Sequence, residues 1–320
     1  MDVRSVERAS DAFQQQVSAD QVEAMCRRAF GADTRVVRVT EIGVGTYNST
    51  YRVDIEGRDP VILRAAPERA LQSRADRDAM RNEYAAAPYF AALGALVPRI
   101  LAADFTHQLI NRDYMFQTLL VGEPASTALD AYPRSYYRQL GAITRAVHDV
   151  RGERFGSVAG PGFTTWSESL RDQFLGMASD FEEAGLDSGD VHRIVAAVDT
   201  HRTALDAVSE PRLLHGDLWQ LNILVAPDAT ITGVLDFDRA SWGDPMADWT
   251  IHRVRQLPGT EADAFWDTYG TPATSAVREQ FYRARNLIGV RLDIHRRGID
   301  LDDVPPVHWD VSEVLSQLCE

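Results

Sequence analysis

Two neighbouring stretches decide the fold and the chemistry of this chain: LHGDLWQLNIL at residues 214–224 and GVLDFD at residues 233–238. The first places Asp217 and Asn222 five positions apart in a short loop after an apolar run. Asp236 follows a second apolar run, across a Pro-Asp turn. Magnesium-assisted phosphoryl transfer needs one carboxylate to orient the attacking hydroxyl, and an amide oxygen and another carboxylate to hold Mg²⁺. The pattern therefore predicts Asp217 as the catalytic residue and Asn222 and Asp236 as metal ligands, in a kinase of a small hydroxylated molecule.

The residues around these side chains separate this prediction from a chance grouping of turn-forming residues. Apolar runs flank all three, which places them at strand ends that face one spot. We interpret His215 as a histidine that packs in the loop and hydrogen-bonds backbone, rather than as a catalytic residue. Asp244, before Pro245, is expected to cap a helix. Asp248 is expected to hold the catalytic loop through hydrogen bonds.

Length and composition exclude several classes of protein. At 320 residues the chain is long enough for a large core, as one bilobed unit or two subdomains. No stretch approaches the roughly 20 apolar residues of a membrane span, and the first residues lack the features of a signal peptide. The cytoplasm is therefore the expected location, with no membrane partner. Cys26 and Cys319 suggest neither a disulfide framework nor a metal site.

The charge of the chain bears on its partners. A formal net charge of −14 argues against nucleic acid, whose binding needs a basic surface. It permits a cationic substrate, although solubility is the simpler explanation. The chain contains no lysine, so the cation of a phosphate site has to be an arginine.

Strand and helix patterns alternate over the first 120 residues. Ser18 opens a capping box for a helix that stops at Gly31. A longer helix is predicted from about Ala75 to Leu93, with a kink or a break at Pro88. Strands are predicted at residues 36–42, 50–55, 60–64, 99–103 and 114–120. Together they predict an antiparallel sheet with one or two helices.

Beyond Gly122 the helical period dominates. Helices are predicted at residues 134–150, 166–184, 191–208 and 275–297, and the β-hairpin with the phosphoryl-transfer motif interrupts them. The expected fold class is α+β and bilobed. Residues 1–121 would form a small nucleotide-binding lobe with the antiparallel sheet. Residues 122–320 would form a larger, mainly helical lobe for catalysis and acceptor binding.

Four residues of the first lobe indicate a nucleotide site. Gly43 and Gly45 lie in a turn between two strands and would let backbone approach phosphates, although an ordinary hairpin turn explains them more simply. Arg64 ends the third predicted strand, where a kinase places the cation for the α- and β-phosphates. Glu83, on the following helix, is its expected ion partner. Either charge alone is explained by a solvent-facing position, but their order after a glycine turn favours a phosphate site.

With these motifs the chain resembles the aminoglycoside phosphotransferase family, the small-molecule branch of the protein-kinase-like fold. The matching segments are residues 42–53, 61–64, 83–102, 115–124, 148, 214–224 and 234–249. The resemblance implies Asp217 as catalytic base, Asn222 and Asp236 as Mg²⁺ ligands, and Arg64 paired with Glu83.

The resemblance also implies where the nucleotide binds. The adenine or guanine of ATP or GTP would lie against the backbone from Gln117 through Thr118 and Leu119 to Leu120. Mg²⁺ is the implied cofactor and the nucleotide the implied co-substrate. Macrolide kinases resemble this motif with histidine at the position of Asn222, which makes a macrolide a less favoured acceptor.

The acceptor pocket is expected between residues 136 and 208 and beyond residue 250. Trp219, inside the catalytic loop, and Asp238 are expected to contact the acceptor. An aromatic wall for a sugar or a nucleoside ring would include Phe163, Trp166 and Trp242, although core packing better explains the two tryptophans. Five acids at residues 180–190 could bind the ammonium groups of an antibiotic, although a solvated helix end is the simpler explanation.

We therefore expect the acceptor to be an antibiotic of aminoglycoside, peptide or nucleoside type, inactivated by a monomeric or homodimeric enzyme. One alternative is a metabolite kinase of choline, homoserine or methylthioribose type. Another is a catalytically weak, nucleotide-binding regulator, which would have lost one of Asp217, Asn222 or Asp236. All three are present.

Overall fold

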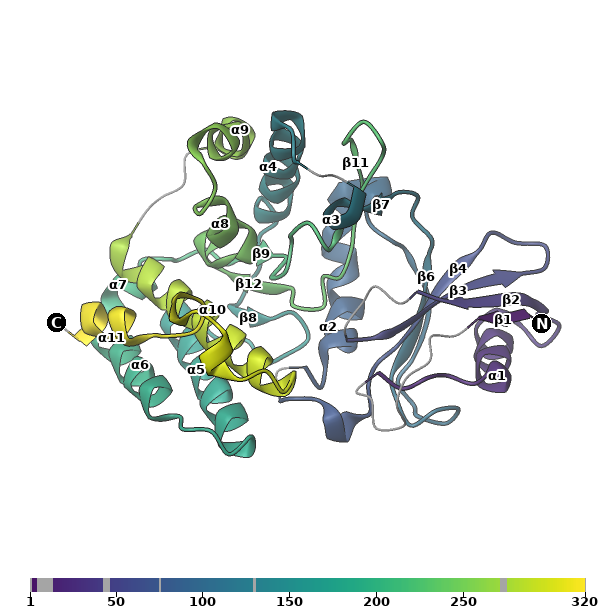
Figure 1. Cartoon of the computed structure of the whole chain (residues 1–320), viewed down its shortest axis with the longest axis horizontal. Coiled ribbons are helices and arrows are strands. Elements are labelled where there is room, and N and C mark those ends of the chain that lie inside the picture. Colours follow the sequence, from purple (N-terminus) through teal and green to yellow (C-terminus); the bar gives the residue numbers. More distant parts are fainter. Residues whose placement is uncertain are drawn as a thin grey trace.

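The computed structural model describes residues 2–4, 14–42, 47–74, 76–128, 131–270 and 275–319. Gly43 and Gly45 lie outside these residues, so their predicted contact with phosphates stays a prediction. The chain forms two lobes along its long axis, a sheet with one helix on its face and a larger helical body (Figure 1). The α+β, bilobed, protein-kinase-like fold is thereby confirmed. Within the described ranges, no helix is both long and apolar enough to cross a membrane.

A six-stranded sheet forms the N-terminal lobe, in the order β1-β2-β3-β4-β6-β5. The strands are β1 (Asp2–Arg4), β2 (Val36–Glu41), β3 (Ser49–Ile55), β4 (Val61–Ala65), β5 (Ile100–Asp104) and β6 (Tyr114–Thr118). The strands β2 to β6 pair antiparallel, as predicted, and the unpredicted β1 adds a parallel edge strand. Alternate residues of β3 are buried against α1 (Ala19–Phe30), whose predicted capping box at Ser18 and end at Gly31 are both present.

The helix predicted from Ala75 to Leu93 is shorter than expected. The helix α2 covers Ala79–Ala86 and continues as the 3₁₀ segment η2 (Ala87–Leu96), while Ala75 lies outside the described residues. Pro88 supports this break because proline has no N–H to donate within a helix. Phe90 and Leu93 of η2 are buried in the core of the C-terminal lobe, so this segment anchors the smaller lobe to the larger one.

The chain passes between the lobes after β6. Val121 is exposed, and Gly122 has a φ of 142°, a conformation that favours glycine. The short strand β7 (Glu123–Pro124) then pairs with β10 of the C-terminal lobe. The lobe boundary expected between residues 121 and 122 stays a prediction, and the course of the chain here agrees with it.

Helices form most of the C-terminal lobe. They are α3 (Ala125–Ala128), α4 (Arg134–His148), α5 (Trp166–Glu183), α6 (Gly189–Thr200), α7 (Arg202–Asp206), α8 (Trp249–Val254), α9 (Gly259–Tyr269), α10 (Ala276–Arg296) and α11 (Ser312–Cys319). The 3₁₀ segments are η1 (Arg69–Leu71) in the smaller lobe and η3 (Pro245–Ala247), η4 (Leu301–Asp303) and η5 (Pro306–His308) in the larger. The single helix predicted at residues 191–208 was wrong. The chain bends at His201, whose ring bonds the carbonyl oxygen of Leu318 at 2.9 Å.

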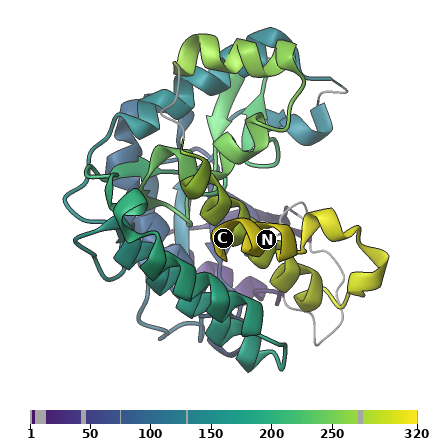
Figure 2. The same ribbon diagram turned by 90° about the vertical axis from the view of Figure 1, so that its left-hand side faces the viewer.

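Two small sheets carry the catalytic segments between these helices. They contain β8 (Gly156–Ser157), β9 (Arg212–Leu214), β10 (Ile223–Val225), β11 (Ile231–Val234) and β12 (Ser241–Gly243). The predicted hairpin is the pair β10 and β11, and β9 pairs with β12. Figure 2 shows α4 and α9 on one side of the lobe, with α5, α6 and α10 on the other.

The aromatic wall proposed for the acceptor is not formed as expected. Trp166 is 1% exposed and Trp242 is 8% exposed, and both pack in the core of the C-terminal lobe. Phe163 packs at the edge of this core. Core packing therefore explains the two tryptophans.

Candidate functional site

The catalytic loop, residues 215–222, runs from β9 to β10. The backbone N–H groups of His215 and Gly216 donate to the two oxygens of Asp248, at 2.9 and 3.1 Å. Gly216 has a φ of 84°, and a Cβ there would lie 2.4 Å from the carbonyl oxygen of Arg239. This position therefore requires glycine, both for its φ and for the close approach of the Arg239 backbone.

A buried relay of side chains fixes Asp248. His148 bonds Asp248 through Nε2 at 3.0 Å, and its Nδ1 bonds the hydroxyl of Tyr269 at 2.9 Å. Burial alone would raise the pKa of Asp248, but the hydrogen bond from His148 and the nearby charges lower it to about 2. Asp248 thus holds the loop as expected. His215 is buried, which lowers the pKa of its ring and favours the neutral, packing form.

Asp217 and Asn222 are joined directly. The Nδ2 of Asn222 donates to the carbonyl oxygen and to Oδ2 of Asp217, at 2.8 and 2.9 Å. Burial raises the pKa of the Asp217 carboxyl to about 6, with a further rise from Asp236 and an opposing effect from Arg239. The amide of Asn222 therefore fixes the orientation of the Asp217 carboxylate.

Asp236 reaches the same place from the neighbouring strand. The N–H of Leu235 donates to the carbonyl oxygen of Asn222 at 2.8 Å, so the ladder between β10 and β11 brings Asn222 and Asp236 to adjacent strand ends. Asp236 has a φ of 61°, which is uncommon for a residue with a Cβ. Such conformations gather at functional sites, where the surrounding structure holds them.

Arg64 connects the two lobes at this point. Its Nη1 donates to both oxygens of Glu83, at 2.6 and 2.5 Å, and its Nη2 donates to Oδ1 of Asp236 at 2.5 Å. The expected pair of Arg64 and Glu83 is therefore present. Glu83 is fully buried rather than solvent-facing, and burial raises the pKa of its carboxyl while Arg64 opposes this rise.

Sequence reasoning missed Asn82 in this network, and it expected only the backbone of Gln117 to have a role, at the nucleotide base. The side chain of Gln117 donates to Oε1 of Glu83 at 3.0 Å. Asn82 uses its whole amide: Nδ2 donates to the carbonyl oxygens of Asp238 and Ala240, both at 2.8 Å, and Oδ1 accepts from Ser157 and Ala159. The one signal in the sequence was the position of Asn82 beside Glu83.

The roles expected for the residues at the nucleotide base and at the acceptor stay predictions. Thr118 ends β6 and Leu119 follows it, both half-buried. Asp238 is half-buried, and burial and Asp236 raise the pKa of its carboxyl well above the usual value. Trp219 is half-buried, with its ring edge against Trp249 at 6.5 Å between centroids.

Asn222 and Asp236 provide an amide oxygen and a carboxylate on adjacent strand ends. Within the described ranges, no group of three or more His, Cys, Asp or Glu side chains could chelate a metal by itself. Mg²⁺ at nucleotide sites takes one or two protein ligands and completes its octahedron with phosphates and water. This donor pair therefore fits Mg²⁺ that arrives with a nucleotide.

The acids at residues 180–190 have partners within the protein. Asp180 accepts from the N–H of Arg74, Glu182 from Ser188 and His192, and Asp190 forms a bidentate pair with Arg291. Glu183 pairs with Arg77 at 3.4 Å. These acids are therefore not a set of free carboxylates for a cationic acceptor.

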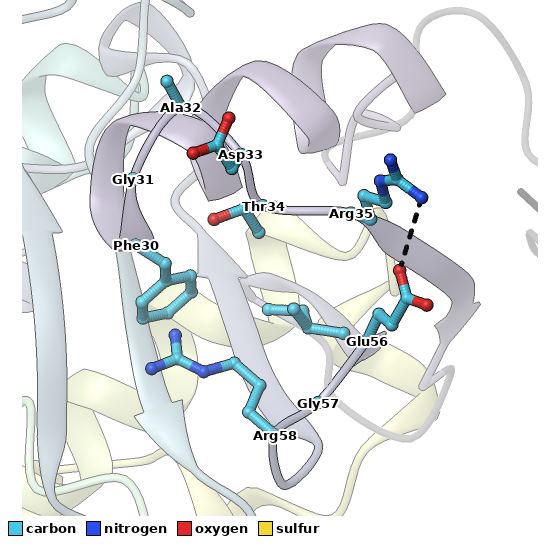
Figure 3. Close-up of a pocket in the computed structure, with 10 residues that line it drawn as sticks. Phe30, Gly31, Ala32, Asp33, Thr34, Arg35, Glu56, Gly57 and Arg58 are labelled. Carbon is cyan, nitrogen blue, oxygen red and sulfur yellow. Dashed lines mark ion pairs between the residues drawn. The ribbon is translucent and has the colours of Figure 1, made fainter.

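A surface hollow of about 360 Å³ lies elsewhere, where α1 ends beside the turn between β3 and β4 (Figure 3). Arg58 covers the ring of Phe30, 4.3 Å from its centroid, and Arg35 faces Glu56 at 3.9 Å. Its arginines are already engaged, and it shares no residue with the site around Asp217.

The fold and this site define a small-molecule kinase of the protein-kinase-like class. A sequence model of the phosphotransferase enzyme family matches residues 38–281, about three quarters of the chain. The chain therefore belongs to this family, and the resemblance to aminoglycoside phosphotransferases is confirmed.

Proteins that are similar to this chain are named for different acceptors. A Klebsiella aerogenes protein named "Probable ketoamine kinase" is 29% identical over 126 residues, which span 38% of this chain and 42% of that protein. A structure from Thermobifida fusca, described as a candidate fructosamine-3-kinase, has a TM-score of 0.64 and 19% identity, covering 94% of this chain and 100% of that one. The macrolide 2′-phosphotransferase of Brachybacterium faecium has a TM-score of 0.57 and 20% identity, covering 92% and 98%. The two structures show the fold alone.

Proposed function

We propose that this chain transfers the γ-phosphate of ATP or GTP to a hydroxyl group of a small molecule. The observation that carries the proposal is the continuous set of contacts from Glu83 through Arg64 to Asp236, with the Asn222–Asp217 pair at the adjacent strand end. These are the parts that phosphoryl transfer requires, because its catalysis consists mainly of positioning and of charge stabilisation.

Each residue has a role that follows from its place. Asp217, fixed by Asn222, would orient the acceptor hydroxyl and accept its proton on the carboxylate. Asn222 and Asp236 would hold Mg²⁺, which when bound neutralises charge on the phosphates. Arg64, fixed by Glu83, would pair with the α- and β-phosphates. Its planar fork lets one guanidinium contact Glu83 and another anion at once.

For the acceptor we favour a hydroxylated metabolite over the antibiotic of aminoglycoside, peptide or nucleoside type expected from the sequence. The acids at residues 180–190, which supported the antibiotic, are engaged with partners within the chain. The partial similarity to a protein named as a ketoamine kinase favours a sugar-derived acceptor. An antibiotic without ammonium groups, such as a nucleoside, stays the second candidate.

A turnover screen tests the proposal. Purified protein with MgATP or MgGTP is offered sugars, sugar acids, ketoamines, amino alcohols and antibiotics, and phosphorylated products are identified by mass spectrometry. We expect at least one product that requires Mg²⁺ and disappears in the Asp217→Asn variant. Nucleotide consumption without any phosphorylated acceptor, or a product that persists in this variant, contradicts the assignment.

A further inference from the structure

A group of side chains comes from the catalytic loop, α8 and α10 and, apart from the expected acceptor contact of Trp219, has no role in the proposed chemistry. We call it the arginine–tryptophan surface, and it consists of Trp219, Trp249, His252, Arg253, Arg285 and Asn286. Its rings follow one another: Trp219 contacts Trp249 edge-on, and Trp249 stacks on His252 at 5.2 Å between centroids. The surface thus begins at the catalytic loop and extends along α8.

The structure ties α8 closely to the loop. Its first residues follow Asp248, which binds the loop backbone, and the hydroxyl of Thr250 donates to the carbonyl oxygen of Leu218 at 2.9 Å. His252 and Arg253 lie one helical turn further on, roughly 5 Å along the axis.

Two arginines of this surface form no salt bridge, although the charge of Asp248 acts on Arg285 from a greater distance. The neighbouring Arg255 and Arg283 pair with Glu279 and Glu313, at 2.8 and 2.7 Å. In the described part of the chain, no carboxylate lies within ion-pair distance of Arg253 or Arg285. Arg285 is half-buried and donates to neutral groups, the carbonyl oxygen of Ala247 and the side chain of Gln173.

A half-buried guanidinium without an anion is unfavourable, because the charge has lost water and gained no ion partner. Burial lowers the pKa of Arg285, and burial together with the surrounding arginines lowers the pKa of His252 to about 4. The shift of Arg285 reports its burial, and only the shift of His252 also reports the positive charge of the surrounding arginines.

The surface also carries unpaired donors. Trp249 Nε1 and Asn286 Nδ2 are buried and have no hydrogen-bond partner among the described residues. One turn along α10 from Arg285, a Cβ added to Gly289 would meet nothing within 4 Å, so space is open beside the arginine. Unpaired cations and donors next to open space suit an anionic group.

We propose that the arginine–tryptophan surface binds the acceptor and that the acceptor carries an anionic group, a carboxylate or a phosphate, at the end remote from the phosphorylated hydroxyl. This inference rests on the proposed function and narrows it to a class of substrate. The aromatic rings would contact the carbon skeleton, and Arg253 and Arg285 would bind the anion. The net charge of the protein is negative, so the rest of its surface repels anions. An anionic acceptor is therefore directed to this local positive surface.

The test compares molecules that differ by one carboxylate. Glucuronate is paired with glucose, and N-fructosylglycine with N-fructosylglycinamide, while kanamycin serves as a cationic compound. Dissociation constants are measured by calorimetry with MgADP present, so that no turnover is needed. We expect the carboxylate of at least one pair to bind about tenfold or more tightly than its neutral partner. Arg253→Gln and Arg285→Gln should each remove most of this preference.

Arg35→Gln is the matched control, because it removes the same charge from an 81% exposed side chain in the other lobe and should leave the preference unchanged. Arg253 is exposed, so its variant tests the idea even if Arg285→Gln fails to fold. The proposal is overturned if both members of each pair bind equally, or if neither carboxylate binds. It is also overturned if kanamycin binds more tightly, or if the preference survives in the arginine variants. If a carboxylate binds in an arginine-dependent way but no acceptor is phosphorylated, the anion site is supported and the proposed phosphotransferase activity is rejected.

Discussion

Asp217 combines two properties that conflict. In the proposed reaction its carboxylate would have to be ionised to accept a proton, yet burial raises its pKa to about 6. The folded protein therefore binds this proton more tightly than the unfolded chain, whose pKa is near 3.8. Stability is lost as the pH rises between these values, and the ionised carboxylate is a cost to folding at neutral pH. Catalytic groups often carry such costs.

We predict that Asp217→Asn lowers kcat by about 10²–10⁴-fold and changes the KM for ATP little. In metal-free buffer the same variant should be more stable than the wild type at pH 7, by up to about 3 kcal/mol. This difference should shrink towards pH 4, where the wild-type carboxyl is protonated too. Thermal unfolding across this pH range and steady-state kinetics measure both effects. Near-full turnover in the variant would reject Asp217 as the base.

At the scale of elements, the helix α2 positions the site by means of two adjacent residues. Glu83 fixes Arg64, and Asn82 holds the backbone of Asp238 and Ala240, between β11 and β12. Phe90, in the 3₁₀ segment that continues α2, stacks on Phe237 at 4.5 Å between centroids. The segment that carries Asp236 is therefore held from the α2 side both by hydrogen bonds and by an aromatic contact.

We predict that Asn82→Ala lowers the free energy of unfolding by about 2–3 kcal/mol, because it leaves buried backbone groups unpaired. It should also raise the Mg²⁺ concentration needed for half-maximal activity, since the Asp236 segment loses its support. Both are measured by urea titration and by metal-dependent kinetics.

Gln139→Ala is the control for this prediction. Gln139 also bridges a helix to the β10–β11 hairpin, through Ala229 and Ile231 at its turn, away from Asp236. Its loss should affect stability but not the metal requirement. An equal change in metal requirement for both variants would show that Asn82 acts on stability alone.

At the scale of the whole molecule, ion pairs join the two lobes around the proposed nucleotide site. Arg64 of the sheet contacts Asp236 of the helical lobe, and Arg296 of α10 pairs with Asp76 at 3.0 Å. A nucleotide with its metal would bind groups from both lobes, and only in the folded state. Its binding is therefore coupled to the stability of the entire chain.

We predict that MgADP at a hundred times its Kd stabilises the protein by about 2.7 kcal/mol, and that ADP with EDTA stabilises it much less at the same concentration. Asp236→Asn should remove the part that depends on Mg²⁺. Asp228→Asn, at the exposed turn of the same hairpin, should retain it. Melting temperatures with and without metal measure the effect. A metal contribution that persists in Asp236→Asn would reject Asp236 as a ligand.

The sequence by itself determined the features that depend on local pattern. Alternating apolar residues predicted the sheet, the helical period predicted α4, α5 and α10, and Ser18 with Gln21 predicted the cap of α1. The spacing of Asp217, Asn222 and Asp236 was enough to predict that they lie together. The loop that carries the first two leads directly into the β10–β11 hairpin, and Asp236 follows the end of that hairpin.

Only the tertiary structure decided what depends on residues far apart in the chain. Arg64 and Asp236 are 172 positions apart, and Asn82 and Asp238 are 156 positions apart, so no local pattern predicts that they meet. Burial is decided in the same way. Glu83 became a buried ion partner and Trp166 a core residue, because elements from elsewhere in the chain cover them. Whether a charge bonds only neutral groups, as Arg285 does, or forms an ion pair, as Asp190 does, depends on what packs against it.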